Sequence, residues 1–254
     1  MCIRDSIGDS NTVRLYANGL ISLQQFCAKE GIGTSAALNE GIVTFKKDSS
    51  RYTIAEAVAK MKPRRVVIML GTNDTKPQNW RGAEPFAAEP GRLADTYRNL
   101  PSHPQVIVLT PVRCFLTEEG TISPQKIADE VRPAVEKLAC ERGLGIINLF
   151  NLFGDRWDAT LMPDRLHPSA IGAGMIARKV GDYLLAGKKG RKPSFVPEGA
   201  TAFCFHGFRG YDFRSEGTDC KVVCPAREAE GRPWVWRCSR QKFRVSLSVA
   251  LLPF

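Results

Sequence analysis

The sequence predicts a three-layer α/β/α sandwich built on a parallel β-sheet. Three continuous apolar runs, at 65–70, 105–111 and 144–150, have the length and composition of buried strands. Runs that are apolar on both faces suit parallel strands lying between two layers of helices. Segments with apolar residues at helical spacing separate these runs, and strands that alternate with helices are typical of this fold class.

The strand predicted at the start of the chain has the least apolar sequence of the predicted strands. Residues 1–6, Met-Cys-Ile-Arg-Asp-Ser, resemble the translated end of a transposon adaptor from sequencing libraries, so we expect them to be non-native. Only Ile3 and Ile7 are apolar ahead of Ser10, which predicts a truncated first strand. A second strand is predicted around 25–28. Because the natural N-terminus is expected to be missing, both an exported and a cytoplasmic location stay open.

Three helices are predicted between and after the strands. The first covers 53–62. Ser123 as N-cap, followed by Pro124 in the first helical position, opens the second, which stops at Gly143. The third begins at Pro168. Apolar residues recur at three- and four-residue spacing on each helix: Ile54, Ala57, Val58 and Met61; Ile127, Val131, Val135 and Leu138; Ile171, Met175, Ile176, Val180 and Leu184.

The composition changes after Gly187, where the third helix is predicted to end. Residues 188–199 form a basic linker rich in Gly and Pro, and residues 200–238 alternate like one or two β-hairpins. Hairpins without a core of their own are marginally stable. The sequence therefore predicts three parts: a domain over 1–187, the linker, and a truncated β-rich fragment over 200–254.

Charge and hydropathy exclude two classes of protein. The chain carries a formal charge of +10, but residues 188–254 hold 13 Lys and Arg against 6 Asp and Glu, which leaves 23 against 20 in residues 1–187. The domain is nearly balanced, so we expect no nucleic-acid partner. No apolar run approaches the roughly 20 residues of a membrane-spanning helix. The sequence does not indicate whether the protein is a monomer or an oligomer.

The cysteines predict free thiols rather than a metal site. The eight are scattered, none forms a Cys-x-x-Cys pair, and the Cys220-x-x-x-Cys224 spacing lacks a second close pair or a nearby His. We expect no metal and no cofactor.

Polar residues suited to ester hydrolysis follow the predicted strands. Ser10 follows the first strand, Asn73 follows the strand at 65–70, and Asp164 and His167 lie between the last strand and the last helix. Ligands of such sheets bind outside the carboxyl ends of the strands. The topology therefore predicts that these four side chains meet at one edge of the sheet.

A Ser, a His and an Asp at one site have the chemistry of a nucleophile and its base. A serine hydroxyl reacts only when a base removes its proton, and a carboxylate can hold the imidazole in the required tautomer. Of the three His residues, His103 lies in a Pro-flanked loop and His206 in the tail, which favours His167 as the base. Taken singly, Ser10 also suits a turn or helix cap, and Asp164 a helix cap beside a surface His.

An amide and a backbone N–H would complete such a site by binding an oxyanion. Asn73 can supply the side-chain amide, although an Asn after a strand also serves a turn. Gly31 is the first candidate for the backbone donor and Gly33 the second, and a plain turn is the alternative for both.

Three segments together resemble blocks of the SGNH/GDSL hydrolase family: Gly-Asp-Ser-Asn-Thr at 8–12, Gly-Thr-Asn-Asp at 71–74 and Asp-Arg-Leu-His-Pro at 164–168. The resemblance covers 7–186. It implies a five-stranded flavodoxin-like sheet in the order 2-1-3-4-5 and no metal. The implied roles are nucleophile for Ser10, base for His167, orienting acid for Asp164, and an oxyanion hole of the Ser10 N–H, the Gly31 N–H and the Asn73 side chain. The second block departs from the family's Asn-x-Gly-x-Ser-Gly form.

Further segments narrow the expected substrate. Residues 71–80 and 101–104 resemble the sialate O-acetylesterase-like branch of bacterial carbohydrate esterases, which implies an acetyl ester on a sugar. Segments 205–208 and 232–237 resemble the opening strands of a fused α/β-hydrolase domain, and the chain has no Gly-x-Ser-x-Gly elbow. The expected activity is that of a metal-independent serine esterase acting on O-acetyl carbohydrate. A short-chain lipase or thioesterase, and a non-catalytic carbohydrate-binding or scaffold protein, are the alternatives.

Overall fold

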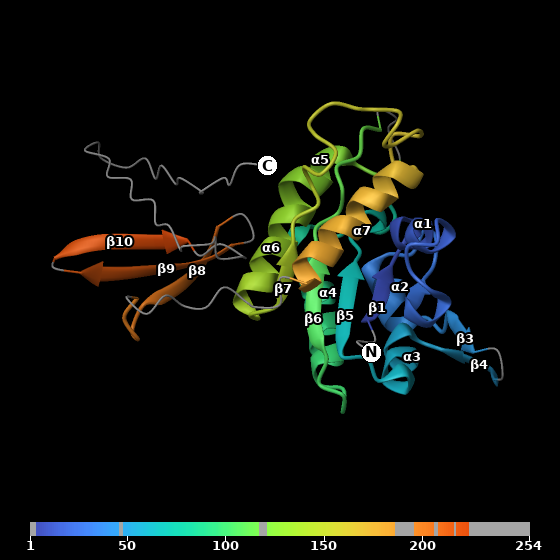
Figure 1. Cartoon of the computed structure of the whole chain (residues 1–254), viewed down its shortest axis with the longest axis horizontal. Helices are drawn as coiled ribbons and strands as arrows, with labels where there is room; N and C mark the ends of the chain where they lie inside the picture. The colour runs from blue at the N-terminus through green and yellow to red at the C-terminus, as the bar shows by residue number, and fades with distance from the viewer. Residues whose placement is uncertain are drawn as a thin grey trace. The chain divides into compact units, whose positions relative to one another are not determined.

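Five parallel strands form the central sheet, in the order β2-β1-β5-β6-β7 (Figure 1). The structure, a computed structural model, describes residues 4–45, 48–116, 121–185, 196–205, 208–215 and 217–223. The chain divides into two compact units, 1–182 and 183–254, and the sheet belongs to the first. Its strands are β1 (Arg4–Gly8), β2 (Phe26–Ala28), β5 (Arg65–Met69), β6 (Gln105–Leu109) and β7 (Gly145–Ile147).

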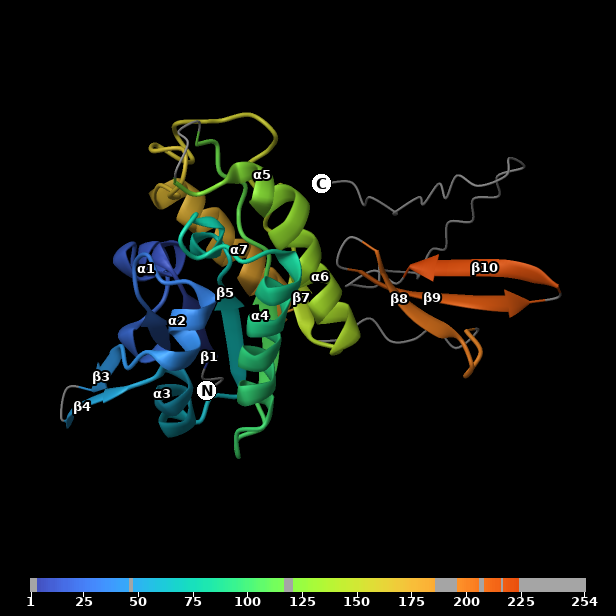
Figure 2. The ribbon, with the colours of Figure 1, turned by 180° about the vertical axis from the view of Figure 1, so that it is seen from behind.

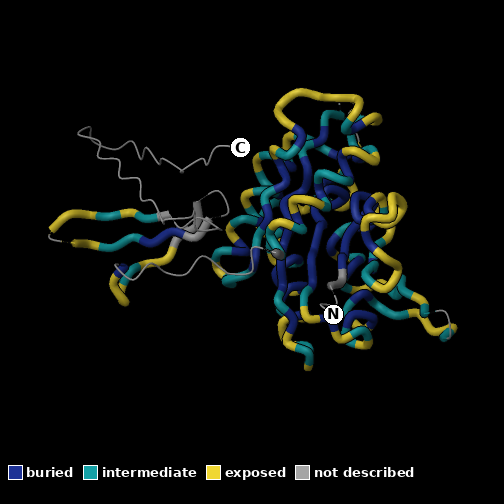
Figure 3. The backbone as a smooth tube through the Cα atoms, viewed as in Figure 1, coloured by how far each residue is buried: buried dark blue, intermediate teal, exposed yellow. Residues whose placement is uncertain are grey.

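This arrangement confirms the predicted α/β class and the strand order 2-1-3-4-5, counted over the strands of this sheet. Helices cover both faces, and the strands are the most buried part of the unit (Figure 3). Along β5, Val66 and Ile68 face one helix layer, whereas Val67 and Met69 face the other. Burial on both faces is the reason that the strand reads as a continuous apolar run.

The two helix layers come from different parts of the chain (Figures 1 and 2). One face carries α1 (Ser10–Ala17) and α7 (Ala170–Leu185), which pack on alternate residues of β1, β5 and β6. The other face carries α2 (Thr34–Asn39), α3 (Ile54–Met61), α4 (Ala83–Arg98) and α6 (Arg132–Glu141). These four pack against one another over the core that contains Val58, Leu93 and Tyr97.

The first strand is not shortened, contrary to the prediction. β1 is five residues long, like β5 and β6, and pairs with β5 over its whole length and with β2 over three residues. Ile7 is fully buried and Ser6 is nearly so. The central position explains this, because hydrogen bonds to two neighbours order a strand whose side chains are poor in apolar surface. β1 includes residues 4–6, and their non-native origin stays a prediction.

Two helix starts follow the predicted caps. Thr53 forms a capping box with Glu56 at the start of α3, and the Ser123 hydroxyl accepts a hydrogen bond from the Lys126 N–H. The second predicted helix is interrupted, because α5 (Pro124–Lys126) and α6 are joined by a π-helical segment, Ile127–Val131. Pro133, the second residue of α6, has no N–H for a carbonyl one turn back, which accounts for the widened turn before it.

The third predicted helix begins at Ala170, two residues after Pro168, where the Ser169 hydroxyl accepts a hydrogen bond from the Gly172 N–H. Residues 186–195, and with them the predicted end at Gly187 and most of the linker, lie outside the described residues.

Sequence patterns missed α1, α2, α4, and the hairpin of β3 (Val43–Phe45) and β4 (Asp48–Tyr52). α4 contains Pro90 in its interior, a residue that normally ends a helix. It is tolerated because Pro90 and the neighbouring Gly91 are buried against the rest of the layer. Short 3₁₀ turns lie at Leu23–Gln25 and Asn73–Thr75.

The second unit contains an antiparallel sheet of β8 (Thr201–Phe205), β9 (Phe208–Ser215) and β10 (Thr218–Val223), in the order β10-β9-β8. This confirms the predicted β-rich fragment, and Val196 and Tyr211 form its buried centre. The segment at 232–237 lies outside the described residues, and the limits of the three predicted parts stay a prediction. Within the described ranges no helix is both long and apolar enough to cross a bilayer. The described cysteines Cys27, Cys114, Cys140 and Cys220 are free thiols.

Candidate active site

Ser10 lies at the junction between β1 and α1. Gly8 ends β1, Asp9 is the N-cap of α1, and Ser10 is the first helical residue. A Cβ on Gly8 would lie 2.1 Å from Thr12 Oγ1 and 2.5 Å from the Met69 carbonyl oxygen, so only glycine fits at this turn. The turn places the Ser10 hydroxyl at the carboxyl edge of the central strand.

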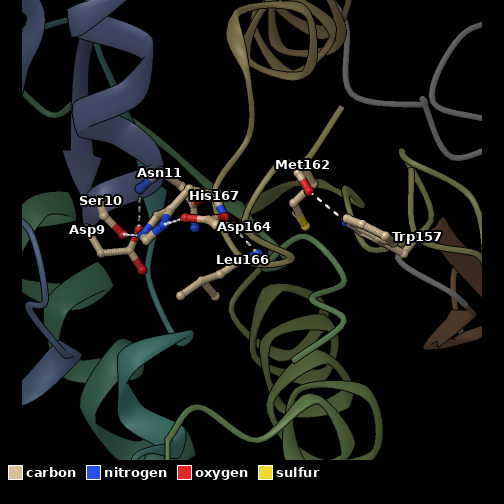
Figure 4. A network of polar contacts seen from close by, with 8 residues as sticks. All are labelled: Asp9, Ser10, Asn11, Trp157, Met162, Asp164, Leu166 and His167. Carbon is tan, nitrogen blue, oxygen red and sulfur yellow. Dashed lines mark hydrogen bonds and ion pairs between the residues drawn. The ribbon is translucent and has the colours of Figure 1, made fainter. Parts of the chain in front are cut away.

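His167, from the loop that precedes α7, lies beside Ser10 (Figure 4). Its Nε2 lies 2.9 Å from Ser10 Oγ, although 157 residues separate the two. Its Nδ1 lies 2.7 Å from Asp164 Oδ2. An ionised carboxylate only accepts hydrogen bonds, so Nδ1 carries the imidazole proton and Nε2 is free to accept the Ser10 hydroxyl proton.

Asp164 is held in place by the backbone that follows it. Its Oδ1 accepts the N–H of His167 at 2.6 Å and the N–H of Leu166 at 3.0 Å, around a turn in which Arg165 has φ +64°. Partial burial raises the pKa of Asp164, but these N–H groups and the imidazole outweigh it and hold the pKa below its usual value. The carboxylate is therefore ionised at neutral pH.

Contacts that the sequence did not reveal hold the loop of Asp164 and His167. The Phe115 N–H donates to the Arg165 carbonyl at 2.8 Å, and the Trp157 indole N–H donates to the Met162 carbonyl at 2.8 Å (Figure 4). The Arg165 guanidinium lies 4.4 Å from the centre of the Trp157 ring. The loop is thus fixed on the side away from Ser10.

Asn73 lies directly beyond β5, at the same edge, and is 3% exposed. Its side-chain amide nitrogen donates to Asp9 Oδ2 at 3.3 Å. Its carbonyl accepts from the Asn79 side chain at 2.9 Å and from the Lys76 N–H at 3.3 Å. The structure therefore brings Asn73 beside the residue that precedes Ser10.

Gly31 and Gly33 lie in the connection between β2 and α2. Gly31 has φ +73°, and in the described part of the chain its N–H has no hydrogen-bond acceptor. Gly33 precedes Thr34, whose N–H and hydroxyl donate to the buried Asp74 carboxylate at 2.8 and 3.2 Å. Asp74 follows Asn73, so the glycine turn is fastened to the Asn73 turn. Asp9 and Asp74 lie within the segments at 8–12 and 71–74 that resemble family blocks, but neither is among the site residues predicted from the sequence.

Two buried carboxylates therefore flank Asn73. The pKa of Asp9 is raised to about 6: burial is the main cause and the nearby Asp74 adds to it, while the Asn11 N–H, His167 and Thr72 act in the opposite direction. Burial also raises the pKa of Asp74. Burial therefore makes the charged form of both carboxylates more costly, although a pKa of about 6 still leaves Asp9 mostly ionised at neutral pH.

The raised pKa of Asp9 predicts a pH-dependent stability. The native state binds this proton more tightly than the unfolded chain, so the stabilisation is complete below about pH 4 and is lost as pH rises through 6. Asp9→Asn should remove this dependence. In urea unfolding, we expect the variant to gain up to about 3 kcal/mol relative to the wild type between pH 4 and pH 7.

The control for this pH experiment is Asp158→Asn. Hydrogen bonds from Thr160 lower the pKa of exposed Asp158, so the stabilisation by its carboxylate is lost only as pH falls below about 4, and the difference between Asp158→Asn and the wild type should stay nearly constant from pH 4 to 7. A difference between Asp9→Asn and the wild type that stays constant from pH 4 to 7 would contradict the prediction.

Comparison with known proteins shows which family this chain resembles in sequence. Residues 6–174 match the sequence model of the GDSL-like lipase/acylhydrolase family, a span that includes Ser10, Asn73, Asp164 and His167. The chain is 28% identical over 201 residues to an acetylxylan esterase of Xylanibacter ruminicola. That alignment covers 69% of this chain and 41% of the relative, so the chain spans about two fifths of the relative's length.

Solved structures show the same fold. A carbohydrate acetylesterase from Sinorhizobium meliloti superposes with a TM-score of 0.53 at 17% identity, covering 72% of this chain and 99% of that protein. An acetylxylan esterase from Geobacillus stearothermophilus superposes with a TM-score of 0.50 at 18% identity, covering 71% and 94%. At these identities the likeness establishes the architecture alone.

Proposed function

The chain belongs to the GDSL-like lipase/acylhydrolase family, and from this premise we propose that it is a serine esterase acting on short acyl esters of carbohydrate. The observation that carries the proposal is the line of contacts from Asp164 through His167 to Ser10, with 2.7 and 2.9 Å between the paired atoms. Such a line supplies a nucleophile, its base and the group that orients the base.

In the first half of the proposed reaction, Ser10 Oγ forms a bond to the acyl carbonyl carbon while its proton passes to His167 Nε2. The carbonyl electron pair moves onto oxygen and gives a tetrahedral oxyanion. When the oxyanion collapses, the bond to the sugar oxygen breaks, and that oxygen takes the proton from Nε2.

In the second half, water attacks the acyl-enzyme and gives its proton to Nε2. The tetrahedral species collapses, the acid leaves, and the proton returns to Ser10 Oγ. Throughout the reaction, Asp164 accepts a hydrogen bond from the Nδ1–H of His167, and it stabilises the imidazolium in both halves.

We assign the oxyanion contacts to the Ser10 N–H, the Gly31 N–H and the Asn73 side chain. Ser10 opens α1, where the helix presents unpaired N–H groups and a partial positive charge. Gly31 and Asn73 lie on the two turns that Asp74 and Thr34 join. All three donors lie at the carboxyl edge that carries the hydroxyl.

Asn73→Ala should lower kcat by about 10²–10³-fold with a small change in KM, since an oxyanion donor acts mainly in the transition state. Steady-state hydrolysis of p-nitrophenyl acetate measures both constants. Asn39→Ala is the control, because the exposed Asn39 amide at the end of α2 donates to the Ser35 carbonyl, and the substitution should leave kcat within about twofold. A kcat for Asn73→Ala within threefold of the wild type would show that the Asn73 side chain does not stabilise the oxyanion.

The carbohydrate assignment is supported by the similarity of this chain to an acetylxylan esterase and a carbohydrate acetylesterase. Acetate release from acetylated xylo-oligosaccharides, compared with p-nitrophenyl esters from acetyl to octanoyl, tests it. We expect release from the oligosaccharides and the fastest model hydrolysis for acetyl. Rates that rise with acyl length would indicate a lipase or thioesterase instead.

Covalent labelling tests the nucleophile without a substrate. A fluorophosphonate should add to the peptide that contains Ser10, as read by mass spectrometry, and prior incubation with the probe should abolish acetate release. Oligosaccharide binding without labelling would favour the non-catalytic carbohydrate-binding alternative.

A further inference from the structure

Asp9 carries a feature that its capping role does not explain. Its Oδ1 accepts the Asn11 N–H at 3.0 Å and so caps α1. Capping needs only a short polar side chain, and Thr53 and Ser123 cap other helices of this chain with uncharged hydroxyls. Asp9 is 0% exposed, and a buried carboxylate is far more costly than a buried hydroxyl.

The second oxygen of Asp9 has a separate partner. Oδ2 accepts a hydrogen bond from the Asn73 side-chain nitrogen at 3.3 Å. The amide of Asn73 has a nitrogen and an oxygen of nearly equal size, and only the nitrogen can donate. A carboxylate accepts and does not donate when ionised, so it selects the orientation in which the nitrogen faces Asp9 and rejects the flipped amide.

The orientation of Asn73 has consequences for the oxyanion. One N–H of the planar amide is directed at Asp9, which fixes the direction of the second N–H. The backbone carbonyl of Asn73 accepts hydrogen bonds from Asn79 and Lys76, so the backbone is held without Asp9. The contact with Asp9 therefore restricts only the rotation of the Asn73 side chain. A flipped amide would present its oxygen to a developing negative charge and oppose it.

We propose that Asp9 is a positioning residue that keeps the Asn73 amide nitrogen directed at the oxyanion, beyond its role as the cap of α1. This inference rests on the proposed esterase function for its catalytic consequence, whereas the Asp9–Asn73 contact itself is independent of it.

Asp9→Asn separates the two roles. An Asn at this position retains an oxygen for the Asn11 N–H and caps as well as Asp does. Its other end is an NH₂ group, which meets the NH₂ of Asn73 donor to donor. Asp9→Ser is the second variant: its hydroxyl can cap α1 but is too short to reach Asn73.

A double-mutant cycle on p-nitrophenyl acetate hydrolysis tests the proposal. We expect kcat to fall about 10- to 100-fold in Asp9→Asn and in Asp9→Ser, with KM within about twofold. In the Asn73→Ala background the same substitutions should change kcat by less than about threefold. Effects of Asp9 substitutions that multiply fully with that of Asn73→Ala would overturn the proposal, as would wild-type kcat in Asp9→Asn.

A second readout does not depend on activity. In ¹⁵N-labelled protein, the Asn73 side-chain amide signals can be identified by their loss in Asn73→Ala. Their exchange with water should be at least about tenfold faster in Asp9→Asn than in the wild type. Unchanged exchange would overturn the positioning role even in a protein that hydrolyses no ester, whereas an inactive wild type with accelerated exchange would count against the esterase function alone.

Thr53→Ala is the matched structural control for both readouts. It removes the cap of α3, which lies away from Ser10, and should lower Tm while leaving kcat and the Asn73 exchange unchanged. A capping defect alone would therefore lower Tm without changing kcat or the exchange of the Asn73 amide.

Discussion

Replacing Ser10 by alanine should lower kcat for p-nitrophenyl acetate by on the order of 10⁴-fold or more, with little change in KM. The substitution removes the atom that lies 2.9 Å from His167 Nε2, and nothing else at that position can form an acyl-enzyme. The remaining activity would reflect water attack assisted by the oxyanion contacts. Because Ser10 is nearly buried and small, Tm should change little.

The companion variants decide whether the residues act as one unit. His167→Ala should cost about as much as Ser10→Ala, and the double variant should be no slower than either single variant, since each removes the same step. Fluorophosphonate labelling should be lost in Ser10→Ala. A Ser10→Ala protein that keeps more than a tenth of the wild-type kcat would rule out Ser10 as the nucleophile.

Gly8→Ala should destabilise the fold by about 3 kcal/mol and also impair hydrolysis. The new Cβ would meet the Met69 carbonyl oxygen of the paired strand at 2.5 Å, and backbone on a central strand cannot move aside as a flexible side chain can. Relief of the clash must shift the turn that carries Ser10. Urea unfolding followed by circular dichroism gives the free energy, and kcat reports the shift of the nucleophile.

Gly174→Ala provides the comparison for this prediction. Gly174 lies in α7, and its added Cβ would have no described atom within 4 Å. The same chemical change should there be neutral or stabilise by about 1 kcal/mol, as for glycine in a helix. If Gly8→Ala unfolds at the same urea concentration as Gly174→Ala, close packing at the β1 turn is not what requires glycine.

The parts of the fold that sequence patterns predicted are those in which burial and local rules agree. β5 and β6 are buried on both faces and read as apolar runs, and α3 has both an apolar face and a capping box. β1 is different, because its order comes from hydrogen bonds to β2 and β5, which are contributed by residues distant in sequence. No pattern within residues 4–8 records those neighbours.

α4 was missed for the opposite reason. Pro90 and Gly91 are poor helix formers, and tertiary packing against α6 and the sheet outweighs that local preference. One close approach illustrates this: a Cβ on Gly91 would lie 2.9 Å from an Arg142 side-chain nitrogen.

The candidate site shows the same division. Ser10, Asn73, Asp164 and His167 were predicted because each follows a strand at the edge where ligands bind. Asp9 and Asp74 also follow these strands, but the significance of each depends on a partner in another turn, Asn73 for Asp9 and Thr34 for Asp74. Those partners become visible only when the turns are placed side by side.

The 157-residue separation between Ser10 and His167 has a consequence for biosynthesis. On the ribosome the hydroxyl emerges first and the imidazole last, after every strand of the central sheet. β1 must also wait for β5 before it is paired on both sides. Under the proposed mechanism, hydrolytic competence therefore arises only when translation has passed the start of α7, and a nascent or prematurely terminated chain would carry a serine that no imidazole activates.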